Sequence, residues 1–571
     1  MKKIISILLF CTMLSLLFVA CNKKDSSKDS TDKQSNSNNV STNEGKTEDK
    51  TTEEKTPEEN KTPSEIVDGR FVETRKITVE VYDRGNDGGS HPEDNFYTNF
   101  IKEGMLRDHN VEVTFVPVPR WTEVEQINNL LAAGEAPDIC LTYDYSTIQT
   151  YAGMGGVLDL STYVEENKDL LPNLWGWLGE TNIYWDKDPV TGTIWALEAK
   201  LAHMTRISTF VREDWLKKLN ISEPKTMEEF EAMLKAFKDN ASTLLGADAD
   251  KMVPFSISFD VGWRADHLLA SYVPNDISDK DFYIYGFDDR KLLLPGYKEG
   301  IRKLNQWYNE GLVWKDFALY GSGDTTEDNM MKAGYVGAFI HNWDYPYRNG
   351  EDSIQNNLKR LVSEDAGYVA IEPFKNNAGV YKKFLPGPVD RKVFLPATND
   401  EPLASLLYLD WISKLENRMF LQIGEEGVTH EVMADGALKT LAATGDKIMN
   451  SPNNIDYTIT INGLDLGDAD KTIKSIALGY VGVDASIIDK AYQLSIHDGR
   501  IGQNINVGKI AAEEGMGPAL SDKRNVLLDQ AVVTTTDKFD EVFDGGMSDY
   551  LSSGGDAIIA ERKAAWEKTF E

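Results

Sequence analysis

The chain has 571 residues, of which 41% are hydrophobic and 27% charged; this is ordinary globular composition and enough length for two or three domains. Its formal net charge is −32, and because Lys2 and Lys3 add +2 while residues 22–68 hold 8 Lys against 12 Asp plus Glu, residues 69–571 carry −30. So acidic a body repels nucleic acid and anionic membrane surfaces, and it argues, less strongly, against a polyanionic substrate.

The first 21 residues have the pattern of an export signal. Lys2 and Lys3 precede a mostly apolar stretch, and the small residues Val19 and Ala20 stand before Cys21. This pattern resembles a bacterial lipoprotein signal peptide, with Phe18 where Leu is usual. The resemblance implies that Cys21 is lipidated and anchors the protein at the extracytoplasmic face of the cell membrane. A plain secretory signal and an uncleaved membrane helix are the alternatives.

Residues 22–68 contain Ser, Thr, Asn, Lys, Glu and Asp with almost no apolar side chains. Such a segment cannot bury enough surface to offset its ordering entropy, so we expect a disordered tether. Removal of Cys11 with the signal and acylation of Cys21 would leave Cys140 as a single thiol. Its place in an apolar strand predicts a buried, inert side chain.

From residue 75 onward the chain alternates strands with helices. Periodicity predicts strands over 75–82, 111–116 and 138–142 and helices over 95–108 and 126–133. Gly134 ends the second helix as a left-handed C-cap, and Pro137 forces extended geometry before the third strand. The β-α-β-α-β order favours a parallel sheet with helices on both faces, and ligands bind such sheets at the carboxyl ends of the strands.

Several segments in register resemble one family. The helix that ends at Gly134, the following Glu-Ala-Pro-Asp-Ile and the later turn 153–159 closely resemble the first lobe of extracellular solute-binding proteins of carbohydrate ABC importers. Further similar segments follow in the family's order: 192–198, 210–219, 223–230, 304–312, 334–343, 409–413 and 424–428. In segment 223–230 the helix start at Thr226, with Glu229 three residues on, predicts a capping box. The resemblance thins after Glu431.

The resemblance implies an α/β fold of the two-lobe periplasmic-binding-protein type (type II), with a hinge between the lobes and the ligand in the cleft between them. It places lobe one at 70–200 plus about 385–430, and lobe two at 205–380 plus much of 431–571. It also implies a monomeric receptor that captures an oligosaccharide and delivers it to the permease subunits of an ABC transporter, with no catalytic residue and no cofactor. The alternatives are an extracellular carbohydrate-active enzyme and a binding protein for a peptide or lipid-like solute.

Sugars offer flat apolar ring faces edged by hydroxyls, so their sites need aromatic planes and short polar side chains. Trp343 is the first candidate, because it follows strand 336–340 where family members present a stacking aromatic, and Asn342 and Asp344 flank it. The other candidates are Tyr143, Asp144 and Tyr145 after the third strand, Trp263 with Asp260 and Arg264, Asp83 and Arg84 after the first strand, and Trp185. For each tryptophan, ordinary packing is the alternative.

Other motifs fail on spacing. Five residues separate Gly502 from Gly508 and Ile510 replaces the Ser or Thr of a phosphate loop, while His430 lacks a second His four residues on. Asp248 and Asp250 stand where some large family members carry a calcium loop, but the Gly and the twelfth-position Glu of a calcium hand are missing. We therefore expect no bound metal.

Overall fold

The computed structural model describes residues 66–84, 91–188, 191–288, 290–321, 323–381, 383–385, 387, 389–447, 456–501 and 507–571. The predicted signal peptide, Cys21 and residues 22–65 of the predicted tether lie outside this part. Within it, every helix is too short or too polar to cross a membrane.

The first sheet is built on β3 (Arg75–Asp83) and β4 (Val111–Pro119), which pair in parallel over their whole length. The sequence predicts both strands, and the structure confirms them. Ile77, Val79 and Val81 bury one face of β3, and toward its carboxyl end Glu80 and Tyr82 are buried on the other face as well.

Two helices bring the first three strands side by side, as predicted. α2 (Phe96–His109) joins β3 to β4 and begins at Asn95, whose side chain accepts two helix amides. α3 (Glu123–Ala133) leads into β5 (Cys140–Thr142) and ends at Gly134 in the left-handed region, φ 71°. The backbone of β3 exchanges hydrogen bonds with the residue just before β5, which gives the order β4, β3, β5.

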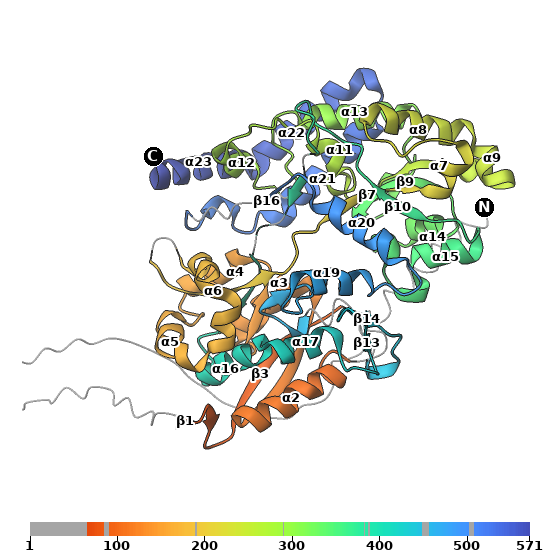
Figure 1. The fold of residues 1–571 in the computed structure, drawn as a ribbon. Helices are drawn as coiled ribbons and strands as arrows, with labels where there is room; N and C mark the ends of the chain where they lie inside the picture. The colour runs from red at the N-terminus through yellow and green to blue at the C-terminus, as the bar shows by residue number, and fades with distance from the viewer. Residues whose placement is uncertain are drawn as a thin grey trace, which may run out of the picture. The chain divides into compact units, whose positions relative to one another are not determined.

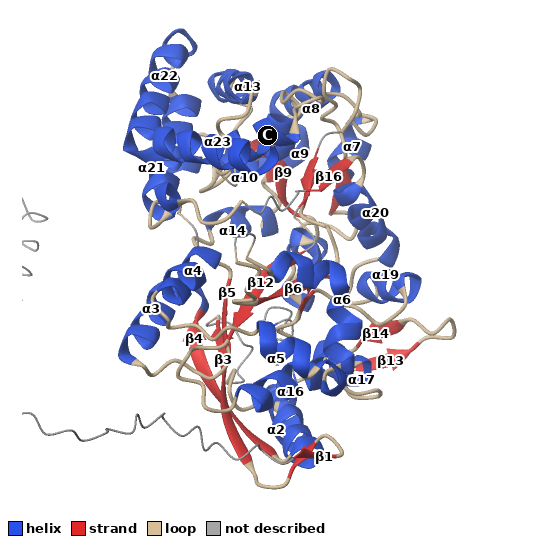
Figure 2. Cartoon of the chain, turned by 90° about the vertical axis from the view of Figure 1, so that its left-hand side faces the viewer, coloured by secondary structure: helices blue, strands red, loops and turns tan. Residues whose placement is uncertain are grey.

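The first sheet continues through strands from distant parts of the chain. β5 pairs with β12 (Val389–Phe394), β12 with β6 (Leu197–Leu201), and β6 with β15 (Ile461–Asn462). Figure 2 shows β4, β3, β5, β12 and β6 following one another across this sheet. The predicted parallel sheet is right for β3, β4 and β5 and wrong for β12, because β12 returns from the second half of the chain in the opposite direction.

The second sheet has the order β10 (Tyr368–Ile371), β7 (Ile207–Arg212), β9 (Val336–Asn342) and β8 (Val253–Ser256). β7 runs antiparallel to both its neighbours, whereas β8 and β9 are parallel. β9 therefore ends at the edge of the sheet where β7 begins.

α8 (Met227–Asp239) begins as predicted at Thr226, whose hydroxyl accepts a hydrogen bond from the amide of Glu229 at 3.2 Å. The reciprocal half of the predicted capping box differs. The Glu229 carboxylate accepts from the amide of Lys225 at 2.7 Å, one residue earlier than the box requires.

The remaining described elements complete both halves of the chain. The other helices are α4 (Tyr145–Gly153), α5 (Ser161–Glu166), α6 (Pro172–Asp186), α7 (Glu213–Leu219), α9 (Ala241–Leu245), α10 (Val261–Arg264), α11 (Asp266–Ala270), α12 (Asp279–Tyr285), α13 (Tyr297–Asn309), α14 (Thr326–Lys332), α15 (Ile354–Leu361), α16 (Pro402–Ser413), α17 (Leu415–Ile423), α19 (Ala469–Ala477), α20 (Ala485–Ile496), α21 (Gly517–Val533), α22 (Phe539–Tyr550) and α23 (Asp556–Phe570). The short strands are β1 (Ile66–Val67), β2 (Arg70–Phe71), β11 (Lys383–Leu385), β13 (His430–Val432), β14 (Leu438–Thr440) and β16 (Gly499–Ile501).

Two large apolar cores form around the two sheets. The first core takes its residues from 71–197 and 393–459, and the second from 207–374 and 477–558. The carboxyl-terminal helices α21, α22 and α23 pack with α12 and α13 around the second core (Figure 1). Cys140 is buried and free, as predicted. The chain passes between the two cores more than once. The exact limits of the two lobes stay a prediction.

Candidate functional site

The carboxyl ends of β3, β4 and β5 lie at one edge of the first sheet, because the three strands are adjacent and parallel. β12 begins at the same edge, since it runs antiparallel to β5. Arg391 is buried there and the other side chains are half-buried. This group is termed the first edge: Asp83, Arg84, Arg120, Tyr143, Asp390 and Arg391.

Tyr82 and Tyr143 form a stacked pair at the first edge. Their ring centroids lie 6.3 Å apart with 15° between the planes. The guanidinium carbon of Arg120 lies 4.3 Å from the Tyr143 centroid and 5.1 Å from that of Tyr82. Arg120 is held by an ion pair with Glu123 at 3.0 Å. The predicted candidate Tyr143 is thus a fixed ring plane beside a cation, which suits stacking on a flat ligand.

A buried carboxylate joins two arginines of the first edge. Asp456 accepts hydrogen bonds from Arg84 Nε at 2.7 Å and Arg84 Nη2 at 3.1 Å, and from Arg391 Nη1 at 2.9 Å. The Asp456 and Arg391 side chains are 0% exposed, and Arg84 is 15% exposed. The predicted candidate Arg84 is therefore fixed in place by a partner far away in the sequence.

The other two predicted residues after β5 are Asp144 and Tyr145, and both interact with neighbouring residues of the protein. The Asp144 carboxylate accepts a hydrogen bond from the Thr147 hydroxyl at 2.8 Å, at the start of α4. Burial, with the negative charges of Glu198, Asp188 and Asp186, raises the pKa of Tyr145, so its hydroxyl is neutral and can donate. Their binding roles stay predictions.

Trp343 lies at the end of β9, on the second sheet. Its amide donates to the Arg206 carbonyl at 3.1 Å, which fixes the backbone. Its half-buried indole meets Tyr480 edge to face at 6.0 Å and Tyr492 at 5.5 Å. The ring therefore has a fixed orientation and keeps part of its surface accessible, as stacking on a sugar requires.

The two neighbours of Trp343 differ in exposure. Asp344 is buried and accepts hydrogen bonds from Arg348 Nε at 2.7 Å and from the Tyr480 hydroxyl at 2.8 Å. It therefore positions the tyrosine that packs against Trp343. Asn342 is half-buried, and its backbone amide donates a hydrogen bond to His341 Nδ1 at 2.8 Å.

Trp263 belongs to a second row of rings beside β9. Its ring meets His341 at 4.8 Å, and His341 stacks on Tyr345 at 3.3 Å. Burial, followed by the charges of Arg264 and Arg348, holds the pKa of His341 well below its ordinary value, so the imidazole is neutral. These rings with Trp343, Tyr480 and Tyr492 are termed the second edge.

Asp260 and Arg264 hold the elements under the second edge together. Asp260 accepts hydrogen bonds from the amide of Trp263 at 3.1 Å and from Arg290 Nε at 2.6 Å. Arg264 is 0% exposed, bonds Glu327 at 2.6 and 2.8 Å and donates from Nε to the Ile340 carbonyl at 2.7 Å. In this structure both residues act by positioning others. The side chain of the remaining candidate, Trp185 on α6, lies outside the described part.

Asp529 on α21 provides a pH-dependent test of this packing. Burial first, and the charge of Asp260 second, raise its pKa from 3.8 to about 6. Because the pKa of Asp529 is higher in the folded state than in the unfolded state, its ionised carboxylate destabilises the fold. This loss of unfolding free energy is absent below about pH 4 and complete above about pH 6. We expect Asp529→Asn to stabilise the fold by roughly 1–2 kcal/mol at pH 7, after solvent screening, and to change little at pH 4. Denaturant unfolding at both pH values measures this, and equal effects at both would contradict it.

Several residues of the two edges were not predicted from the sequence. Arg120 directly follows β4, so the strand-end rule that selected Arg84 could have found it. The strand-end rule does not find Arg391, because Arg391 lies near the start of the antiparallel strand β12. It does not find Asp456 either, because Asp456 lies in a segment without periodicity. Tyr480 and Tyr492 come from the region where the family resemblance thins.

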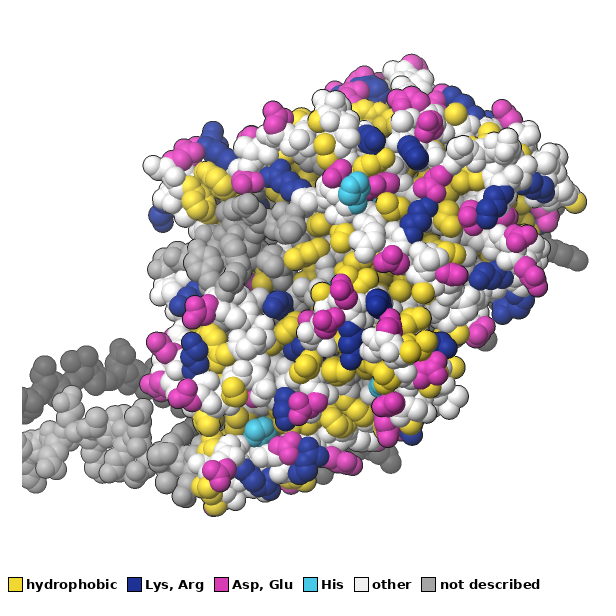
Figure 3. Space-filling view, viewed as in Figure 1, with side chains coloured by type: hydrophobic (Ala, Val, Ile, Leu, Met, Phe, Trp, Pro, Cys, Tyr) yellow, Lys and Arg dark blue, Asp and Glu magenta, His cyan; other side chains and the backbone are white. Residues whose placement is uncertain are grey.

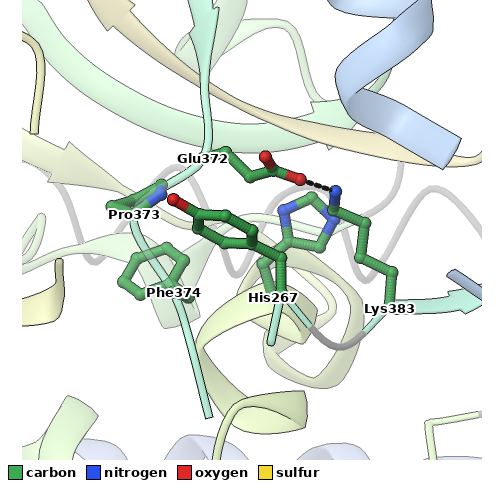
Figure 4. Close-up of a pocket in the computed structure, with 6 residues that line it drawn as sticks. His267, Glu372, Pro373, Phe374 and Lys383 are labelled. Atoms are coloured by element: carbon green, nitrogen blue, oxygen red, sulfur yellow. Dashed lines mark hydrogen bonds and ion pairs between the residues drawn. The ribbon is translucent and has the colours of Figure 1, made fainter. Parts of the chain in front are cut away.

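A small cavity of about 10 Å³ lies at the end of β10, lined by His267, Glu372, Pro373, Phe374, Tyr381 and Lys383 (Figure 4). Lys383 pairs with Glu372 and donates to the carbonyl of His497 at 2.9 Å. Burial lowers the pKa of Lys383 despite the opposing effect of Glu372. Ligand pockets usually measure about 300–1,000 Å³. The cavity is too small for an oligosaccharide, and its residues instead tie β11 to α20.

Among the described residues, no group of three or more His, Cys, Asp or Glu side chains could hold a metal ion. In the segment compared above with a calcium loop, Asp248 forms an ion pair with Lys251 at 2.8 Å.

Comparison with known proteins identifies the family of this chain. A family model described as bacterial extracellular solute-binding protein matches residues 101–385. The chain belongs to the bacterial extracellular solute-binding proteins. Two relatives of this solute-binding protein come from Bacillus subtilis. Lipoprotein LipO is 26% identical over 236 residues, 40% of this chain and 43% of LipO, and the polygalacturonan/rhamnogalacturonan-binding protein YtcQ is 24% identical over 242 residues, 41% of this chain and 44% of YtcQ.

The fold of this solute-binding protein has solved counterparts. The crystal structure of the alginate-binding protein AlgQ2 without calcium ion matches with a TM-score of 0.59 and 18% identity, covering 87% of this chain and 98% of AlgQ2. The comparison confirms the predicted α/β, two-lobe fold of type II. The chain spans less than half of the length of both Bacillus subtilis relatives.

Proposed function

We propose that this solute-binding protein captures a soluble oligosaccharide outside the cell and delivers it, chemically unchanged, to the permease subunits of an ABC transporter. The names of two similar proteins support a carbohydrate ligand, since YtcQ is a polygalacturonan/rhamnogalacturonan-binding protein and AlgQ2 an alginate-binding protein. The absence of chemical conversion and the identity of the transporter partner are parts of this proposal.

The pairing of ring planes with hydrogen-bonding groups at both edges is the observation that supports it most. Tyr143 is held beside Arg120, and Trp343 is held edge to face by two tyrosines. A sugar ring has an apolar face for such planes and hydroxyls for the surrounding polar side chains. We therefore propose the earlier candidates at both edges as ligand-binding residues, with Asp260, Arg264 and Asp344 acting through the rings that they position.

Each lobe would contribute one edge to the site. We assign residues 70–200 and about 385–430 to lobe one and 205–380 with much of 431–571 to lobe two; the pairing of β15 with β6 supports adding 456–462 to lobe one. The crossing segment 202–206 would act as part of the hinge. A ligand that contacts both edges binds the closed arrangement more tightly than the open one and so shifts the population toward it.

A panel of oligosaccharides tests the proposal. The purified protein is mixed with fragments of xylan, mannan, arabinan, pectin and starch, and its melting temperature is measured, because a ligand that binds the folded state raises it. The oligosaccharide is then recovered and analysed for cleavage or other chemical change. Stoichiometric binding without product supports capture, catalytic turnover supports an enzyme, and the absence of any saccharide binding would contradict the proposal.

Anchoring through Cys21 is the other part of the proposal. We expect Cys21→Ser to abolish lipidation, because the thiol is the acceptor for the lipid in the lipoprotein pattern. Cells grown with a labelled fatty acid should yield labelled protein for the natural sequence and unlabelled protein for the variant. Cys11→Ser, which changes the other cysteine of the signal, is the control and should leave labelling intact. Label on the Cys21 variant would refute the anchor.

A further inference from the structure

One carboxylate at the first edge neutralises two cations. Asp456 is completely buried and bonds Arg84 on one side and Arg391 on the other, at 2.7 to 3.1 Å. Arg391 also donates to the Ile461 carbonyl at 2.6 Å, which fixes its guanidinium on the end of β15. The two arginines and the aspartate thus form one rigid unit.

This unit makes both guanidinium groups poor receptors for a ligand carboxylate. A ligand carboxylate could bind them strongly only by displacing Asp456, and a buried carboxylate that loses its partners is strongly unfavourable. Arg120 is likewise paired with a buried carboxylate. Its partner Glu123 is 4% exposed and also accepts a hydrogen bond from the amide of Tyr143 at 3.0 Å.

The remaining charges at the two edges disfavour an anion further. Asp83 and Asp390 add negative charge to the first edge. At the second edge, Arg348 bonds Asp344 and Arg290 bonds Asp260. Figure 3 shows acidic and basic side chains interspersed over the face that it presents, and residues 69–571 have a surplus of acid. The field at the site therefore opposes a polyanion.

We propose that Asp456 sets the charge selectivity of the site: it occupies Arg84 and Arg391, so that the protein takes uncharged oligosaccharides and discriminates against uronates. The proposal rests on the proposed capture of oligosaccharides and narrows its ligand class. It separates this chain from the ligands in the names of YtcQ and AlgQ2, because polygalacturonan and alginate are acidic.

Matched ligands test the proposal. Each neutral hexose oligosaccharide of the panel is paired with the same oligosaccharide oxidised to the carboxylate at its primary hydroxyls, and both dissociation constants are measured by calorimetry. Because like charges at a binding site are strongly unfavourable, we expect the neutral member to bind at least about tenfold more tightly. Asp456→Asn should narrow this preference by about tenfold, since it leaves two guanidinium groups without their shared anion.

Two further variants keep the result interpretable. Glu401→Gln removes the partner of Arg75, which begins β3 at the opposite end of the sheet, and should leave the preference unchanged. Should Asp456→Asn fail to fold, the half-buried Asp390→Asn at the first edge should narrow the preference in the same direction. Equal or tighter binding of the oxidised sugar by the natural protein would overturn the charge proposal while leaving capture intact. Binding of no saccharide at all would overturn both.

Discussion

Replacing Trp343 by alanine is expected to weaken oligosaccharide binding by at least about tenfold, because a stacking indole is among the largest single contributors to a binding site. The same change removes two edge-to-face contacts, with Tyr480 and Tyr492, so we also expect the fold to lose roughly 1–2 kcal/mol of stability. Calorimetry with the best oligosaccharide of the panel measures the first effect, and denaturant unfolding measures the second.

Trp566 offers a matched control for this variant. It is also half-buried and also meets two rings, Tyr283 at 5.7 Å and Phe570 at 4.6 Å, but it lies on α23, which contributes no residue to either edge. Trp566→Ala should therefore lower stability by a similar amount and leave the dissociation constant unchanged. Unaltered affinity in Trp343→Ala would remove that residue from the site, and equal losses of affinity in both variants would point to a general loss of packing.

The parts of the fold that local chemistry determines could be predicted from the sequence. The alternation in 75–82 predicted β3, and a glycine at the end of 126–133 predicted the left-handed cap that Gly134 adopts. The antiparallel entry of β12 could not be predicted in this way, because strand direction depends on where the chain returns from and not on its own side-chain pattern. The half-formed capping box at Thr226 shows the same limit on the scale of one residue.

The candidate site also contains residues that could be predicted from the sequence and residues that could not. Strand ends followed by aromatic or polar residues can be recognised in the sequence, and they predict Tyr143 and Arg84; for Trp343 the family resemblance adds to the strand end. The partners that fix those residues could not be predicted. Arg84 is 372 residues from Asp456, and Arg264 is 63 residues from Glu327. With 92 acidic side chains in the chain, only the folded structure shows which carboxylate each arginine meets.

Removal of Glu327 is expected to produce the largest loss of stability. Its carboxylate accepts from both Arg264 terminal nitrogens and from the Ser256 hydroxyl at 2.5 Å, and Arg264 is 0% exposed. Glu327→Ala would leave that guanidinium buried with no counter-ion, which typically destabilises a protein by about 3–5 kcal/mol. Denaturant unfolding followed by circular dichroism measures the loss. Glu310→Ala, which breaks an exposed pair with Lys235, should change stability by less than about 1 kcal/mol.

A double variant identifies the cause of this loss. If the unpaired charge is what destabilises Glu327→Ala, then replacing both partners, Arg264→Met with Glu327→Leu, should be less destabilising than the single change, since no charge is then left buried. Arg264 also bonds the Ile340 carbonyl, so the double variant should still loosen the end of β9 and weaken sugar binding through Trp343. A double variant less stable than Glu327→Ala would instead show that the hydrogen bonds of Arg264 to the backbone, and not the buried charge, dominate its contribution.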